Sequence, residues 1–511
     1  MSKFTWERLL SQTRVADGVI EYPADEDRNA TFHKDSERIL TSSAFRRLQG
    51  KTQVYPLPST DFVRNRLTHT YEVAHIGQTI AKRISKKLRL EYEDAEAFSQ
   101  LVFNGCLLHD LGNPPFGHSG ESSIREFFSP GGEGNDLEVV KNALGNEDYA
   151  KDLTLFDGNA QGFRIATKLA GWKERGGLRL SAGTLTAMVK YPFPSNADLA
   201  KKGKFGFMCD EQAFATLAFE KCGLFEPQRH VLYRNPLSLV VEAADDIAYL
   251  TSDVQDAYRY NDISFNNARQ LLDGICTEKE KVSFPEIKRE DKDYNDNVIS
   301  YLRSAAVSRM IRAAADILTH TVFQKNILMQ ADEKFDLWNN SDIPSEFKDI
   351  SISEEKIRAA CNSLVYRGKR KISLQVSGGK IIKYVLLMQL KALSEIYAAL
   401  HQEIFPFPNV SERIKSNTSV NPSIEEVSKY LVDNVDKFVS RESAQIFWGM
   451  PGDTHDILQD LLITAKKENR EQHDSRTAYR IVQVSVDFVA GTTDRYLSEY
   501  SRQWSGPYIS H

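Results

Sequence analysis

Four side chains of metal-binding type lie in, or at the end of, apolar segments with helical spacing. His69 shares the apolar stripe of residues 68–90, so its ring should face the buried side of a helix. His109 and Asp110 follow one another at the end of the segment LVFNGCLLHDLG. Because adjacent helical side chains diverge by about 100°, this pair serves one ion only if the ion lies between them. Taken singly, a histidine at such a position is more often a satisfied core residue than a ligand, and the aspartate is equally compatible with a solvent-facing helix end.

The segment LSLVVEAADDIAYL adds three carboxylates to an otherwise apolar helix. Glu242 and Asp246 can face water or pair with arginine, which leaves Asp245 on the apolar stripe. Buried carboxylates are costly unless they are paired or bound to a cation. With the two histidines and Asp110, Asp245 would complete a set of two imidazoles and two carboxylates. Such a set leaves room for two waters on an octahedral ion, and it suits Mn, Mg or Fe better than a closed structural zinc site.

The segments that carry these residues predict a mainly α-helical fold. Apolar residues recur at three- and four-residue intervals from Ser36 onward, along 68–90 and again at 237–258. Gly112, followed by Asn-Pro-Pro, should end the helix that bears His109. The stretch KRKISLQVSGGKIIKYV (369–385) alternates around Ser-Gly-Gly, which predicts one small β-hairpin.

Composition narrows the class of protein. The 511 residues include 65 Lys plus Arg and 70 Asp plus Glu, a formal charge of −5, with 41% hydrophobic and 26% charged residues. These values exclude a disordered chain, a collagen-like chain and a globally basic nucleic-acid packer. The five cysteines form no CxxC pair, so neither a disulfide framework nor a zinc ribbon is indicated. Lacking an apolar leader or a run of about 18 apolar residues, the chain is expected to be reduced, soluble and cytoplasmic.

The order His69, His109-Asp110, Asp245 resembles that of the HD-domain metal-dependent phosphohydrolases. The flanking segments RRLQGKTQVYPL, RNRLTHTYEVAHIG, LLHDLGNPPFGHSGE and VEAADDIAYLTSDVQD resemble those of the bacterial deoxyguanosine triphosphate triphosphohydrolases (dGTPases). Weaker likeness through RTAYRIVQVSVDFVAGTTDRY (476–496) extends the resemblance over most of the chain. It implies metal-dependent hydrolysis of dGTP, or of other dNTPs, at the α-phosphorus, which yields a deoxynucleoside and inorganic triphosphate.

The chain is expected to have three parts. Because residues 1–35 are polar, we expect them to form an N-terminal arm that is not part of the core, and the resemblance implies an HD-domain helical core at 36–275. A helical C-terminal region at 276–511 would pack on this core and complete the substrate pocket. Relatives form ring-like hexamers or other homo-oligomers, so a homo-oligomer is expected here, without membrane contact.

His118, in the loop PPFGHSGE, is the general acid or base that the resemblance implies. Glu121, three residues on, would orient it or stabilise its charge. A histidine titrates near neutral pH and suits either role. The alternative is a helix cap, with His118 at the N-cap and Glu121 at the third position of the helix ESSIREFF.

The resemblance further implies a substrate pocket. Arg66 lies three residues before His69 and would bind phosphate through two hydrogen bonds. Tyr249 and Asp253 follow Asp245 at i+4 and i+8, on one helical face, and would meet the sugar. The other positions that match the family's substrate contacts are Gln53 at the sugar hydroxyl, Asn159, Lys190, Tyr191 and Lys204 at the phosphates, and Arg480 near the C-terminus. Each has a structural alternative, such as a packed tyrosine or a surface lysine.

Two rival functions stay open at this point. One is an HD-domain enzyme that acts on a nucleoside monophosphate or an alarmone nucleotide. The cations Arg66, Lys190 and Lys204 argue against it, because they favour a substrate with a longer polyphosphate. The other is a non-enzymatic nucleotide sensor or nucleic-acid-binding module, which would not need an intact metal set. None of the quoted motifs carries guanine recognition. The basic clusters AKKGK (200–204) and RGKRK (367–371) are either solvated faces or a surface for activating single-stranded DNA.

Overall fold

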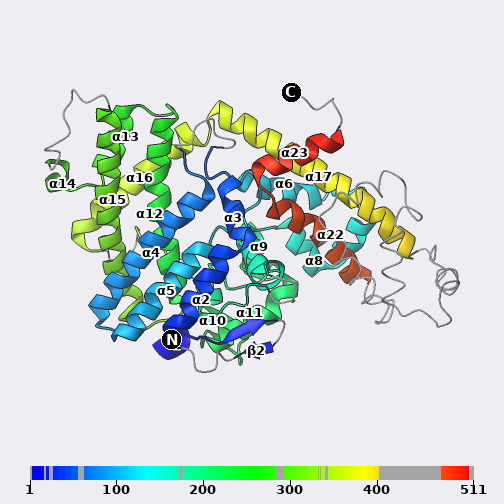
Figure 1. Ribbon diagram of the computed structural model, residues 1–511, viewed down its shortest axis with the longest axis horizontal. Coiled ribbons are helices and arrows are strands. Elements are labelled where there is room, and N and C mark those ends of the chain that lie inside the picture. The colour runs from blue at the N-terminus through cyan, green and yellow to red at the C-terminus, as the bar shows by residue number, and fades with distance from the viewer. Residues whose placement is uncertain are drawn as a thin grey trace. The chain divides into compact units, whose positions relative to one another are not determined.

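The structure is a computed structural model that describes residues 3–16, 19–21, 27–55, 63–171, 177–282, 293–331, 333, 335–339, 343–401 and 474–505. Most of them are helical, so the mainly α fold class is confirmed (Figure 1). No helix within these ranges is long and apolar enough to cross a membrane.

The chain forms two compact units. Unit 1 consists of Met1–Gly117 and Asp157–Val376, and unit 2 consists of His118–Phe156 and Ser377–His511. One division between them falls inside helix α17 (Lys369–His401), whose first turns belong to unit 1. The limits of the two units do not coincide with the domain boundaries expected after residues 35 and 275. The expected domain boundaries stay a prediction.

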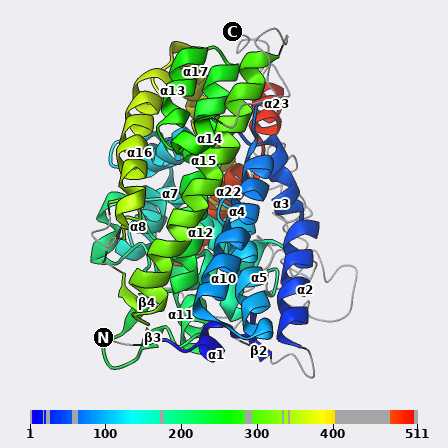
Figure 2. The same ribbon diagram turned by 90° about the vertical axis from the view of Figure 1, so that its left-hand side faces the viewer.

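Four long helices form the centre of unit 1: α4 (Arg66–Leu88), α5 (Tyr92–Leu108), α12 (Pro236–Arg259) and α15 (Tyr294–Leu318). Helix α12 packs on the other three, and α4, α12 and α15 lie side by side (Figure 2). The apolar stripe of α4 is buried in this packing, as its three- and four-residue spacing predicts. A Cβ added to Gly77 of α4 would lie 2.6 Å from Sγ of Cys106 in α5, so only glycine allows this close approach.

The remaining helices of unit 1 are shorter. They are α1 (Trp6–Leu9), α2 (Arg28–Thr41), α3 (Ser43–Arg47), α9 (Gly158–Arg164), α10 (Ala182–Met188), α11 (Gln212–Lys221), α13 (Phe265–Asp273), α14 (Glu278–Val282) and α16 (Lys348–Ala360). Strands β3 (Phe225–Glu226), β4 (Val231–Arg234) and β5 (Met329–Gln330) form a small antiparallel sheet. Strands β1 (Arg14–Ala16) and β2 (Val19–Glu21) form a separate antiparallel pair.

Side-chain caps fix where the two helices of the predicted site begin. The Asn65 side chain accepts a hydrogen bond from the backbone N–H of Thr68, at the start of α4. The Asn235 side chain does the same for Leu237 at the start of α12, where Pro236 takes the first helical position. These caps set the first turn of α4, which carries His69, and the start of the helix that carries Asp245.

The prediction that residues 1–35 lie outside the core is wrong. Phe4, Leu9 and Val15 are buried in the same apolar cluster as the central helices. A buried ion pair holds the polar part of the segment, because Arg14 donates to Asp35 at 2.6 Å. Asp35 also accepts a hydrogen bond from Ser181 at 2.6 Å. Phe4, Leu9 and Val15 therefore point inward, although the composition of the segment is polar.

The β-hairpin predicted at 369–385 is also wrong, because these residues form the first half of helix α17. The apolar residues Ile382, Val385 and Leu386 are buried, and their spacing of i, i+3 and i+4 places them on one face of the helix. Gly379, which suggested a turn, serves close packing instead. A Cβ there would lie 2.5 Å from Oγ of Ser123.

Unit 2 contains α6 (His118–Phe128), α7 (Glu138–Leu144), α8 (Glu147–Thr154), most of α17, α22 (Asp474–Gly491) and α23 (Asp494–Ser505). Helix α22 packs on α7. Tyr479 of α22 stacks on Tyr149 with ring centroids 4.4 Å apart, and its hydroxyl donates to Asp152 at 2.8 Å. The C-terminal segment thus completes the packing of residues 118–156.

Candidate active site

The four predicted metal ligands lie together in unit 1. His69 comes from the first turn of α4, His109 and Asp110 follow the end of α5, and Asp245 comes from the middle of α12. Ligand atoms of His69, His109 and Asp110 all lie within 4.8 Å of one another. Oδ1 of Asp245 is 2.9 Å from Nε2 of His69 and 3.6 Å from Nε2 of His109.

The hydrogen bonding of His109 prepares one ring nitrogen to bind a cation. Its Nδ1 lies 2.6 Å from the backbone carbonyl of Cys106, which only accepts hydrogen bonds, so Nδ1–H is the donor. In the neutral ring, Nε2 then carries a lone pair. This Nε2 is buried, and it has no hydrogen-bond partner among the described residues. It faces Asp110 and Asp245, so the donor set fits a divalent cation.

Electrostatics keep the two carboxylates of the cluster ionised. Burial raises the pKa of Asp110, but Arg66, whose guanidinium lies 2.7 Å away, and the two histidines hold this pKa well below its usual range. Burial likewise raises the pKa of Asp245, and His109 and His69 lower it further than burial raises it. The pKa of His69 is raised, since its bond to Asp245 outweighs the effect of burial.

The predicted sugar contacts form a second group on the same helix. Tyr249 and Asp253 follow Asp245 along α12, and the hydroxyl of Tyr366 contacts both the Tyr249 hydroxyl and the Asp253 carboxylate. Asp253 is 1% exposed, and burial raises its pKa to about 7. Its second oxygen, Oδ1, is buried without a hydrogen-bond partner in the described part of the chain.

A cavity of about 50 Å³ adjoins this group, and it is lined in part by Tyr249, Asp253, Arg358 and Tyr366. Arg358 and Tyr366 are not predicted from the sequence, because they lie outside every motif that resembles the family. Their spacing of eight residues, about two helical turns, is a signal in the sequence, although it identifies no partner. Arg358 lies 3.5 Å from Asp246, so this carboxylate pairs with arginine, as its structural alternative predicts.

Two predicted phosphate contacts, Lys190 and Lys204, are held by buried or half-buried carboxylates. Nζ of Lys190 lies 2.7 Å from Glu242, which also pairs with Arg234. Burial lowers the pKa of Lys190, but Glu242 raises it further, so this side chain stays a cation. Nζ of Lys204 lies 3.5 Å from Asp157.

Asn159, Tyr191 and Gln53 complete the predicted contacts of unit 1. The Asp157 side chain accepts hydrogen bonds from the backbone and the side chain of Asn159, at 2.9 and 2.8 Å. The ring centroid of Tyr191 is 5.6 Å from Nζ of Lys190. Oε1 of Gln53 is buried and has no hydrogen-bond partner among the described residues, so it is available to a ligand hydroxyl.

The predicted proton-transfer pair belongs to unit 2. Helix α6 begins at His118, and Nδ1 of His118 lies 3.0 Å from Oε2 of Glu121. The side chain of His118 is 84% exposed and that of Glu121 is 4% exposed. Arg125 lies 3.7 Å from the same Glu121 oxygen. Arg480, on α22, is also part of unit 2 and is half-buried.

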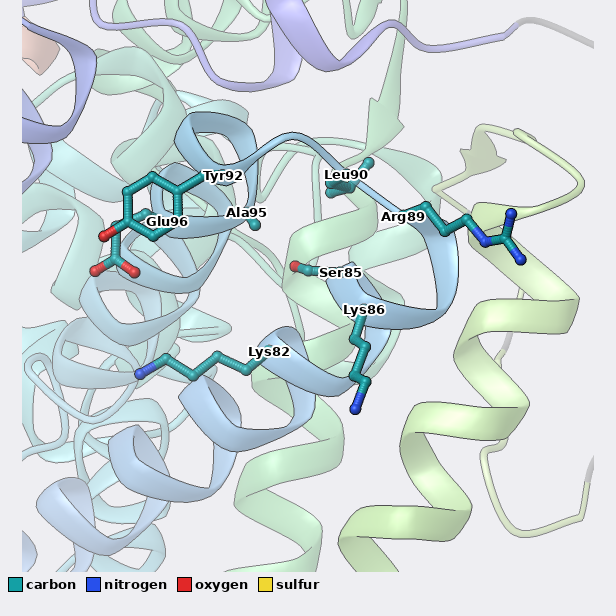
Figure 3. A pocket seen from close by; sticks show the side chains of 8 residues that line it. All are labelled: Lys82, Ser85, Lys86, Arg89, Leu90, Tyr92, Ala95 and Glu96. Atoms are coloured by element: carbon teal, nitrogen blue, oxygen red, sulfur yellow. The ribbon is translucent and has the colours of Figure 1, made fainter.

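A larger hollow of about 510 Å³ lies at the far end of α4, about 20–25 Å along the helix from His69. Lys82, Lys86 and Arg89 line it together with Tyr92 and Glu96, and Figure 3 shows the three cations pointing in different directions. Because none of the predicted site residues lines this hollow, its size does not make it the candidate site.

Comparison with known proteins shows the family of the chain. Residues 66–152 match the HD domain family. A deoxyguanosinetriphosphate triphosphohydrolase-like protein of Pseudomonas aeruginosa is 32% identical over 389 residues, which cover 75% of this chain and 84% of the relative. One from Listeria monocytogenes is 30% identical over 75% of this chain and 82% of its own length. A deoxyguanosinetriphosphate triphosphohydrolase of Yersinia pseudotuberculosis is 31% identical over 61% of this chain and 68% of the relative.

Proposed function

Because the chain belongs to the deoxyguanosinetriphosphate triphosphohydrolase-like family of HD-domain phosphohydrolases, we propose that it hydrolyses dGTP, alone or with other dNTPs, to a deoxynucleoside and inorganic triphosphate. The observation that supports this most is the grouping of His69, His109, Asp110 and Asp245 in unit 1. Helix α12 joins this grouping to Tyr249 and Asp253, so metal ligands and sugar contacts share one rigid element.

The four residues of the metal cluster would hold one divalent ion, Mn or Mg, with Fe as a further option. When bound, such an ion polarises a phosphoryl oxygen and lowers the pKa of a coordinated water. The chain supplies ionised carboxylates from Asp110 and Asp245, and a fixed tautomer of His109. Arg66 is held against Asp110 and provides a cation at the same place for the α-phosphate.

His118 would transfer the proton that the reaction requires, either to the departing 5′-oxygen or from the attacking water. The buried Glu121 carboxylate bonds to Nδ1 of His118 and so orients the ring. With Nδ1 held in this way, Nε2 is the nitrogen that exchanges a proton with the substrate.

The remaining predicted residues would bind the two ends of the nucleotide. Lys190, Tyr191, Lys204, Asn159 and Arg480 would contact the triphosphate. Glu242 and Asp157 hold the two lysines in place, so these side chains would lose little conformational freedom when the substrate binds. Gln53 and Asp253 would bind the 3′-hydroxyl, and Tyr249 would crowd C2′ and exclude a ribose hydroxyl.

We extend the proposal to the surroundings of the enzyme. It would act in the cytoplasm as a homo-oligomer, of which a hexamer is one form, and single-stranded DNA is a candidate activating ligand. The expected core at 36–275 would carry the metal site, and the region 276–511 would complete the pocket.

Product analysis tests the proposed reaction. The purified protein is incubated with each of the four dNTPs and with GTP, in the presence of Mn or Mg, with and without single-stranded DNA. We expect inorganic triphosphate and a deoxynucleoside from dGTP, and little turnover of GTP. Release of pyrophosphate or of monophosphate would instead favour a different HD-domain phosphohydrolase, and an absence of all products would favour a nucleotide-binding module.

The variant Asp245→Ala serves as the control for this assay. It should abolish turnover and bound metal while the protein stays folded. Normal metal content by elemental analysis in this variant would contradict the assignment of Asp245 as a ligand.

A further inference from the structure

Lys371 is a buried lysine that the sequence pattern does not predict. It lies in the basic cluster RGKRK, for which a solvated face was one expectation, yet the residue is 8% exposed. Its Nζ lies over the face of the Tyr366 ring, 4.2 Å from the centroid. Tyr366 in turn contacts Asp253 and Tyr249 through its hydroxyl. Lys371 therefore adjoins the predicted sugar contacts.

The position of Lys371 is unfavourable for a purely structural cation. Within the described residues, its ammonium makes no hydrogen bond to the protein and no ion pair. It lies in the first turn of α17, where the helix dipole disfavours positive charge. Burial lowers the pKa of Lys371 to about 8, although Asp253 acts in the opposite direction. A buried ammonium is normally paired, so these features indicate a ligand that supplies the missing acceptor.

The chemistry of the neighbouring carboxylate indicates what that ligand group is. Oδ1 of Asp253 is a buried acceptor without a donor in the described part of the chain, and Nζ of Lys371 is a donor without an acceptor. The two residues form no ion pair with each other. A hydroxyl group donates one hydrogen bond and accepts others, so a single hydroxyl satisfies both side chains. A carbonyl oxygen can only accept and so satisfies only the ammonium, and a protonated amine can only donate and so satisfies only the carboxylate.

We propose that Lys371 is a substrate-binding residue whose ammonium donates to the 3′-oxygen of the deoxyribose while Asp253 accepts the 3′-hydroxyl proton. This inference rests on the proposed function, because it assumes a deoxynucleotide in the site. Lys371 would then contribute to recognition of an intact 3′-hydroxyl, together with Gln53 and Asp253. It would not contact the triphosphate.

The variant Lys371→Met tests this assignment, because methionine keeps an unbranched apolar chain and removes the donor. The substrates are dGTP and 2′,3′-dideoxy-GTP, which lacks the 3′-hydroxyl. We expect kcat/KM for dGTP to fall about 10–100-fold, the loss typical of a hydrogen bond to a charged group, and kcat/KM for the dideoxy substrate to change little. Inhibition by inorganic triphosphate should stay as in the wild type. Lys380→Met, an exposed lysine of the same helix, is the matched control and should behave as the wild type.

Other outcomes would overturn the inference. An equal loss for both nucleotides means that Lys371 binds a different group or only supports the fold. A lower melting temperature together with weaker triphosphate inhibition means a structural role. Calorimetry gives a test that does not need turnover. It measures how tightly deoxyguanosine and 2′,3′-dideoxyguanosine bind to the wild type, to Lys371→Met and to Lys380→Met. If the wild type hydrolyses no nucleotide, the proposed function fails, while the binding comparison still decides the role of Lys371.

Discussion

At the scale of single residues, the hydrogen-bond partner of one histidine ring nitrogen determines which role the other ring nitrogen can take. The Cys106 carbonyl fixes the proton of His109 on Nδ1 and leaves Nε2 for a cation. Glu121 holds Nδ1 of His118, so Nε2 is the nitrogen that would exchange a proton in the proposed reaction. A neutral carbonyl suits a ligand that must stay uncharged, and a carboxylate suits a base that becomes positively charged.

Replacing His118 by Asn separates proton transfer from helix capping. Asparagine is among the preferred N-cap residues, so a purely structural His118 would leave activity nearly normal. We expect kcat to fall roughly 10²–10⁴-fold, the usual contribution of a positioned acid or base. KM should change little, because the phosphate contacts are untouched. Steady-state triphosphate release and a thermal melt check this, and activity within a few-fold of the wild type would favour the cap.

Asp253 gives a prediction about pH and stability. Its pKa is raised to about 7 by burial, so the folded protein holds this proton at pH values where the unfolded chain has lost it. The folded state is thereby favoured at low pH, and the advantage is lost as the pH rises through about 7. Asp253→Asn removes the buried charge, and we expect it to raise the melting temperature at about pH 8 but not at about pH 5. An equal shift at both pH values, or the same shift in the exposed control Glu93→Gln, would contradict this cause.

The sequence shows which site residues share a helix, but it does not show which distant residues meet them. Periodicity alone aligned Asp245, Tyr249 and Asp253 on α12. Tyr366 contacts Asp253 across 113 positions of the chain and Tyr249 across 117, and only the folded packing creates these contacts. The same limit explains why a basic cluster did not identify Lys371 as buried.

At the scale of elements, the close approach of α4 and α5 sets the distance between His69 and His109. Gly77→Ala would place a Cβ 2.6 Å from Sγ of Cys106, so this sulfur or one of the two helices must shift. We expect a loss of about 1–3 kcal/mol in the free energy of unfolding, typical of overpacking, measured by denaturant titration. The loss should be smaller in a Cys106→Ala background, which removes the clashing sulfur. Gly368→Ala is the control, because its nearest neighbour would lie at 3.4 Å.

Helices are predictable from the sequence where the apolar spacing is regular. The prediction is wrong in α17, where a glycine pair is compatible both with a turn and with close helix packing. The stripes of α4 and α12 and their buried faces follow from the sequence. In α17, the pair Gly378-Gly379 predicts a turn. In the structure, Gly379 lies within the helix and allows it to pack closely against Ser123. Local sequence does not distinguish these two uses, because the contact that requires glycine comes from a segment more than 250 residues earlier in the chain.

At the scale of the whole molecule, a bound metal should stabilise the folded chain. Ligand binding to the native state alone adds about 2.7 kcal/mol when the free metal is at 100 times its Kd. We therefore expect Mn to raise the melting temperature of the metal-free protein. His69→Ala should lose this increase, and the exposed His75→Ala on the same helix should keep it. An unchanged increase in His69→Ala would contradict the assignment of His69 as a ligand.

The carboxylates that hold the predicted phosphate contacts also bear on how a chain of net charge −5 accepts a polyanion. Arg66, Lys190 and Lys204 already pair with Asp110, Glu242 and Asp157. Because protein carboxylates rather than salt ions already neutralise these cations, the proposed binding of triphosphate would release few salt ions to the solvent. Binders with unpaired lysines lose affinity steeply as salt rises, since they displace counterions. Here we expect KM to depend only weakly on ionic strength, and a log–log slope that counts all three cations would contradict this expectation.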